Sequence, residues 1–88
     1  MTIKEFQTII ADQYEAVDRK RGTPKTFMWF MEEIGELATA LASEDKENQK
    51  EEFADVLAWL CTLANINNID LEETCQKYSS GDLKGFKP

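Results

Sequence analysis

Two apolar stretches separated by a short polar segment constrain the fold of this chain more than any other feature of its sequence. They cover residues 27–41, FMWFMEEIGELATAL, and residues 51–64, EEFADVLAWLCTLA. Within each stretch the apolar side chains recur every three or four residues, which is typical of a helix with one buried face. No part of the chain alternates between apolar and polar residues as a strand does. The sequence therefore predicts an all-α fold around two helices whose apolar faces must be covered.

Acidic side chains lie beside the apolar faces of both predicted helices. Glu33 and Glu36 are three residues apart on the first helix, and Glu52 and Asp55 repeat that spacing on the second. Residues three or four apart share one face of a helix, so an antiparallel pair of helices would bring all four carboxylates together. Charges this close to an apolar core are costly unless something compensates them.

The alternative is that these residues simply form the solvated face of each helix, because glutamate is a good helix former. That explanation suits any one of them better than it suits all four together. Neither motif contains a basic residue, so converging carboxylates would repel one another and some would take up protons. A divalent cation relieves this repulsion, and a ligand set made only of carboxylates suits Mg²⁺ or Mn²⁺.

The two motifs, EEIGE at residues 32–36 and EEFAD at residues 51–55, resemble the EExxE and ExxD signature of the MazG-like nucleotide pyrophosphohydrolases. These enzymes belong to the all-α NTP pyrophosphatase superfamily. EEIGELATAL and EEFADVLAWL are similar to that family's second and third helices, and NINNIDLEET is similar to its final connection and helix. The likeness covers about residues 3–78. It implies a four-helix protomer with a central antiparallel helix pair, assembled into an oligomeric helical bundle.

The resemblance also implies the reaction, which is hydrolysis of a nucleoside triphosphate between the α and β phosphates to give a monophosphate and pyrophosphate. Mg²⁺ is the implied cofactor, with Mn²⁺ as a substitute, and the implied metal ligands are Glu33, Glu36, Glu52 and Asp55. Metal ions that bridge carboxylates and phosphate oxygens can neutralise the leaving pyrophosphate and lower the pKa of an attacking water.

Glu32 and Glu36 are the candidate catalytic residues. Glu32 either orients the site and helps to deprotonate the water, or is an exposed helix glutamate. Two alternatives to the main prediction remain. One is an activity like that of phosphoribosyl-ATP pyrophosphohydrolase, which has related motifs, and the other is a non-catalytic helical dimerisation module.

Trp59 is the first candidate for substrate binding. It lies four residues after Asp55 and seven after Glu52, so the three share one face of a helix, and the indole could meet the base or sugar. An aromatic residue at this spacing can equally belong to the core. Trp29, four residues before Glu33 on the other helix, is the competing candidate.

A basic cluster lies between the first two predicted helices and consists of Arg19, Lys20, Arg21 and Lys25. It is either a solvated loop between helices or a rim that attracts phosphate, and Lys25 is the residue we assign to substrate binding.

Side chains that cap helices mark the expected helix starts. Thr2 and Glu5 have the spacing of a capping box for the first helix, and Asp70 is placed to cap a short last helix. Thr23, directly before a proline, is the expected N-cap of the second helix.

The composition sets further limits. The chain has 88 residues and no histidine, and the absence of histidine excludes a histidine base and a histidine-containing zinc site. Its net charge of −7 argues against binding nucleic acid or an anionic membrane. Cys61 and Cys75 are expected to be buried free thiols. No apolar run reaches the roughly 18 residues of a membrane span, and the first residues are polar, so we expect a cytoplasmic protein. We expect one domain over residues 1–80, a mobile tail over residues 81–88, and a homodimer or homotetramer that covers the apolar faces.

Overall fold

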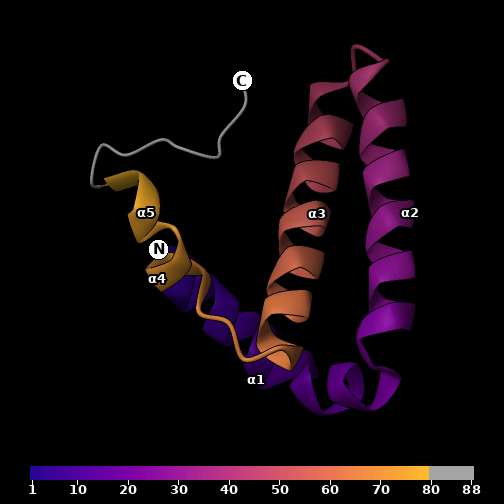
Figure 1. Cartoon of the computed structure of the whole chain (residues 1–88). Helices are drawn as coiled ribbons and strands as arrows, with labels where there is room; N and C mark the ends of the chain where they lie inside the picture. The colour runs from indigo at the N-terminus through magenta and orange to yellow at the C-terminus, as the bar shows by residue number, and fades with distance from the viewer. Residues whose placement is uncertain (80–88) are drawn as a thin grey trace.

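The computed structural model describes residues 1–79 and shows an all-α architecture, as the sequence predicts (Figure 1). Its helices are α1 (Ile3–Arg21), α2 (Thr23–Leu41), α3 (Lys46–Ile66), α4 (Leu71–Thr74) and α5 (Gln76–Ser79). The single short helix expected at the end of the domain is therefore two short helices, which are separated at Cys75. The tail predicted over residues 81–88 lies outside the described residues.

α2 and α3 form an antiparallel hairpin, which confirms the predicted central helix pair (Figure 1). α1 crosses the open end of this hairpin at an angle and packs mainly against α3. α4 lies against α1, so the end of the described chain returns to the N-terminal side of the molecule. The closed end of the hairpin extends well beyond α1, and Figure 1 shows no other described helix beside it.

The junction between α1 and α2 depends on Gly22. Its φ of 85° lies in the left-handed region, which glycine adopts without the steric cost that a Cβ brings. Gly22 is also the N-cap of α2 and provides no side chain to satisfy the first N–H groups, so the prediction that Thr23 caps this helix is wrong. Thr23 is already the first residue of α2, because α1 continues to Arg21 and leaves one residue for the turn.

Side-chain caps define the other helix starts. The capping box at α1 is confirmed, because Glu5 N–H donates to Thr2 Oγ1 at 3.0 Å and Thr2 N–H donates to Glu5 Oε1 at 2.8 Å. Asp70 caps α4 as predicted, accepting from Glu73 N–H at 3.2 Å. In the hairpin turn, the buried Gln49 side chain donates to the Ser43 carbonyl at 2.9 Å. This hydrogen bond gives a partner to a carbonyl group that lies two residues after the end of α2.

Polar side chains tie α1 to the end of α3. Gln7 is buried, and its Nε2 donates to Asn65 Oδ1 at 2.9 Å and to the Ile69 carbonyl at 2.7 Å. Leu71 N–H donates to Gln7 Oε1 at 2.9 Å, so one glutamine holds both the end of α3 and the start of α4. Arg19 completes the junction by donating to Asn65 O at 2.9 Å.

The apolar core is small. Among residues 1–79 the buried apolar side chains are those of Ile10, Ala40, Cys61 and Ala64. Cys61 is a buried free thiol as predicted, and burial raises its pKa. Cys75 is free but exposed, so the prediction that it is buried is wrong; it lies between the short helices α4 and α5, which leave it on the surface of the described part of the chain. None of the helices within residues 1–79 has the length and apolar character needed to cross a membrane.

Candidate metal centre

Three carboxylates converge between α2 and α3. Glu33 and Glu36 from α2 and Glu52 from α3 each place one carboxylate oxygen so that all three oxygens lie within 4.8 Å of one another. This carboxylate cluster arises because the two motifs occupy facing turns of an antiparallel hairpin, and the three-residue spacing keeps Glu33 and Glu36 on one side of α2.

The cluster is partly removed from water. Glu33 and Glu52 are half-buried, and Glu36 is exposed. The Oε2 atoms of Glu33 and Glu52 are buried and have no hydrogen-bond partner within residues 1–79. None of the ion pairs formed within the described residues involves these three side chains. An anionic oxygen buried without a partner is unfavourable, so the protein alone leaves this site uncompensated.

The electrostatics of the cluster favour uptake of a cation or of protons. Burial raises the pKa of Glu33 above its usual value, and the nearby charges of Glu36, Asp55 and Glu52 raise it further. The pKa of Glu52 is also raised by burial, with Glu36 and Asp55 again adding to the shift. The donor set consists of carboxylate oxygens alone, two of them unpaired, and therefore fits a hard divalent cation.

Two further acidic residues were predicted for this site. Asp55 lies outside the group of three, yet its charge contributes to the raised pKa of both Glu33 and Glu52, so it is nearby. Its role as the fourth ligand stays a prediction. Glu32 is exposed on α2 and also lies outside the group, and its catalytic role stays a prediction.

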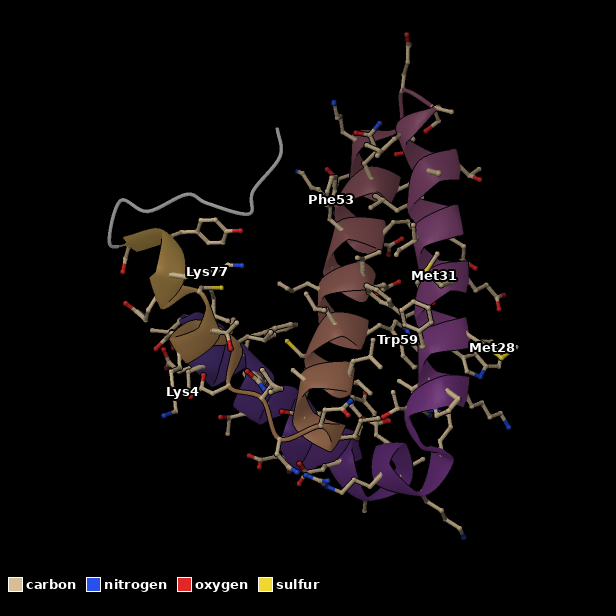
Figure 2. All side chains as sticks on the ribbon, viewed as in Figure 1. Lys4, Met28, Met31, Phe53, Trp59 and Lys77 are labelled. Carbon is tan, nitrogen blue, oxygen red and sulfur yellow. The ribbon has the colours of Figure 1, made fainter. Side chains whose placement is uncertain are left out.

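Trp59 lies on the half of α3 nearer to α1, as Figure 2 shows. It is half-buried and packs against the Arg21 guanidinium, whose central carbon lies 5.0 Å from the ring centroid. Trp59 is thus neither fully buried in the core nor a free surface side chain. Trp29 on α2 is 44% exposed, and Lys25 in the first turn of that helix is also exposed. The three predicted substrate contacts stay predictions.

The structure divides the basic cluster that the sequence presents as one group. Arg21 donates from Nη2 to Asp18 Oδ1 at 2.6 Å and from Nε to Thr26 Oγ1 at 2.9 Å, and Arg19 is bound to the end of α3. These two arginines therefore stabilise helix junctions and do not form a solvated loop. Asp18 and Thr26 are buried and were not among the predicted residues, although the spacing of three residues between Asp18 and Arg21 is a signal for their ion pair.

The fold and the cluster define a class of protein. It is an all-α protein whose central antiparallel helix pair carries a group of carboxylates that could hold a metal ion. Residues 22–80 match the family model of the MazG nucleotide pyrophosphohydrolase domain, and the chain belongs to this family. The match includes both acidic motifs, and it confirms the resemblance identified from them. Family membership supports a nucleotide pyrophosphohydrolase activity in general. A comparison with curated proteins gives no match.

Proposed function

We propose that this protein hydrolyses a nucleoside triphosphate between the α and β phosphates, with Mg²⁺ as its cofactor, and releases a monophosphate and pyrophosphate. The carboxylate cluster is the observation that carries this proposal: Glu33, Glu36 and Glu52 bring their oxygens within 4.8 Å, in a chain of the MazG family. Mn²⁺ has the same preference for carboxylate oxygens and is the proposed substitute.

Each residue of the site has a distinct proposed task. Glu33, Glu36, Glu52 and Asp55 hold the divalent cation, which when bound supplies charge neutralisation on phosphate oxygens and a water of lowered pKa. The half-buried Glu33 and Glu52 lie in the hairpin, where the pairing of α2 and α3 fixes their separation. Glu36 is exposed and can meet the substrate as well as the cation. Glu32, which directly precedes Glu33 in the sequence, is the proposed acceptor of the proton from water.

The acidity of the chain makes a cation necessary for substrate binding. A net charge of −7, with three carboxylates gathered at the site, repels a triphosphate. Lys25 is the proposed positive contact for phosphate, because it is exposed at the start of α2. Trp59 and Trp29 are the proposed contacts for the base. The expected cytoplasmic location is part of the same proposal.

The proposed assembly is a homodimer or homotetramer. Large apolar side chains remain exposed along the hairpin, including Met28 at 71% and Phe53 at 55% exposure. Figure 2 shows Met28 on the side of α2 that faces away from α3, so packing within the chain does not cover it. A second copy of the chain would bury these surfaces in a helical bundle.

The test is a panel of nucleoside triphosphates together with phosphoribosyl-ATP, incubated with the protein and Mg²⁺ and assayed for pyrophosphate and for orthophosphate. We expect pyrophosphate and a monophosphate from a preferred substrate. Glu36→Ala or Asp55→Ala should reduce turnover by at least about a hundredfold, the range seen when an electrostatic contact to the transition state is removed. Release of orthophosphate with a diphosphate product would contradict cleavage between the α and β phosphates. Preference for phosphoribosyl-ATP would favour an activity like that of phosphoribosyl-ATP pyrophosphohydrolase. No turnover of any substrate would favour a non-catalytic helical dimerisation module.

A further inference from the structure

Arg21 joins three helices through one side chain. It is the last residue of α1, where its Nη2 donates to Asp18 Oδ1 at 2.6 Å, and its Nε donates to Thr26 Oγ1 on α2 at 2.9 Å. Its guanidinium also lies over the ring of Trp59 on α3, with its central carbon 5.0 Å from the ring centroid. These contacts place one planar cation where α1, α2 and α3 meet.

The guanidinium of Arg21 is held in one orientation. Both of its hydrogen-bond partners are buried, since Asp18 is 4% exposed and Thr26 is fully buried. The donors of an arginine form a rigid planar fork, so two fixed acceptor oxygens determine how that plane lies. Asp18 also compensates the positive charge of Arg21, so a contact with a phosphate group would compete with an ion pair at 2.6 Å.

Trp59 benefits from such a support because core packing does not enclose it. The side chain is half-buried and lines a cavity of about 360 Å³ between α1 and α3, together with Arg21 and Asp18. A cavity offers no atoms to contact, so packing does not hold the ring from that side. The guanidinium gives the ring a fixed contact, and a cation over an indole is favourable in itself.

We propose that Arg21 is a positioning residue for the substrate, because it holds the indole of Trp59 in the orientation that meets the base and does so without touching the nucleotide. The inference rests on the proposed function, which takes Trp59 as a contact for the base. Arg21 covers one face of the ring, so a base can stack only on the other. An indole that is already held in place loses less conformational freedom when the base binds, which raises affinity.

Two variants test this role while keeping the ion pair. In Arg21→Lys the ammonium group can still pair with Asp18, but it provides no planar group to lie over the ring and no second donor fixed toward Thr26. Thr26→Val keeps the arginine and removes only the hydroxyl that accepts from Nε. Gln7→Ala is the control for lost stability, because it breaks hydrogen bonds between α1 and the end of α3 and leaves Arg21 intact.

The first measurement is the order of the Trp59 ring in ¹⁵N-labelled protein without nucleotide. The heteronuclear NOE of an indole N–H reports motion on the picosecond to nanosecond timescale. The chain has two tryptophans, and Trp59→Phe identifies the Trp59 signal by removing it. We expect a rigid indole in wild type and Gln7→Ala, and a mobile one in Arg21→Lys and Thr26→Val.

The second measurement is steady-state kinetics with Mg²⁺ and the nucleoside triphosphate that the substrate panel selects. Arg21→Lys should raise KM by about five- to tenfold and leave kcat within about twofold, because the lost stacking serves binding and not the chemical step. Gln7→Ala should keep the wild-type KM, which does not depend on the fraction of protein that is folded. Inhibition by inorganic pyrophosphate, which has no base, should be the same in wild type and all three variants.

Three results would overturn the inference. They are an indole equally rigid in wild type and Arg21→Lys, an unchanged KM in that variant despite a mobile indole, and weaker inhibition of that variant by pyrophosphate, which would make Arg21 a phosphate contact. Failure of the proposed reaction gives a different pattern, because no form of the protein then hydrolyses a triphosphate. The indole NOE alone then decides whether Arg21 holds the Trp59 ring.

Discussion

Single carboxylates in the metal centre have opposite effects on stability and on binding. Glu33 and Glu52 are each surrounded by like charges, and each has one buried oxygen without a partner within residues 1–79. Removing one charge should therefore relieve repulsion in the metal-free protein. The same change should lower the affinity of the carboxylate cluster for a cation. The same side chain would cost stability without the metal and contribute stability with it.

The stability of the metal-free protein should depend on pH in a defined direction. The pKa of Glu33 and of Glu52 is raised in the folded state above the ordinary value of 4.5. The folded protein therefore holds more protons than the unfolded chain between pH 4.5 and the raised pKa values. The free energy of unfolding must then decrease as pH rises through this window. Thermal melts in chelator between pH 4.5 and 8 would show this as a falling melting temperature.

Mg²⁺ should reverse that trend, because protons and the cation compete for the same oxygens. A cation at a hundredfold excess over its Kd stabilises the folded state by about 2.7 kcal/mol. Glu52→Gln should flatten the pH dependence in chelator and lose most of the response to Mg²⁺. Glu44→Gln, at an exposed position in the turn before α3 and outside the group of three, is the matched control and should keep both. An unchanged melting curve in millimolar Mg²⁺ would contradict the metal site.

Whole helices are positioned by a few polar side chains whose partners lie far away in the sequence. Gln7 on α1 is the clearest case, with hydrogen bonds to Asn65, Ile69 and Leu71. Without its side chain, the Ile69 carbonyl and the Leu71 N–H would lose their partner at the α3–α4 turn. Such a residue acts as a connection between elements rather than as part of a surface.

Gln7→Ala should therefore lower the free energy of unfolding by about 2–3 kcal/mol, from the loss of several hydrogen bonds and the unsatisfied groups left behind. Gln13→Ala makes the same change at an exposed position of α1 and should cost less than about 0.5 kcal/mol. Urea unfolding of both variants measures the difference. Equal stabilities would show that the network around Gln7 contributes little to holding α1 and α4 in place.

Local signals in the sequence were sufficient to predict the helices and the pairing of the two acidic motifs. The capping box at Thr2 and the period of the apolar residues act within a few turns of one helix, so the sequence displays them directly. The roles of Gln7 and Asp18 depend on residues and surroundings brought together by folding, so each looks like an ordinary polar residue of α1. For the same reason, helical spacing predicted the converging carboxylates, whereas nothing local revealed the cavity beside Trp59.

The molecule as a whole is too open for a compact single chain. Its radius of gyration is 14.3 Å, against about 12 Å for a compact domain of this length. Its accessible surface is 6548 Å², against roughly 5,300 Å² for a compact monomer of this size. Large apolar side chains of the hairpin are exposed, among them Met28 on α2 and Phe53 on α3, and Figure 1 shows no other described helix beside its closed end. We infer that a second copy covers this surface.

The wild-type protein should accordingly be a dimer or tetramer at micromolar concentration, measured by light scattering coupled to size exclusion. Phe53→Glu places a charge at a 55% exposed apolar position of α3 and should weaken assembly by at least about 2 kcal/mol, or roughly 30-fold in Kd. Lys50→Glu, one turn earlier on the same helix, changes the net charge by a larger amount but alters only an exposed ion pair with Glu47. If burial of apolar surface drives assembly, Phe53→Glu dissociates and Lys50→Glu does not. A monomeric wild type, or equal dissociation of both variants, would show that the exposed face of the hairpin is not an interface between copies.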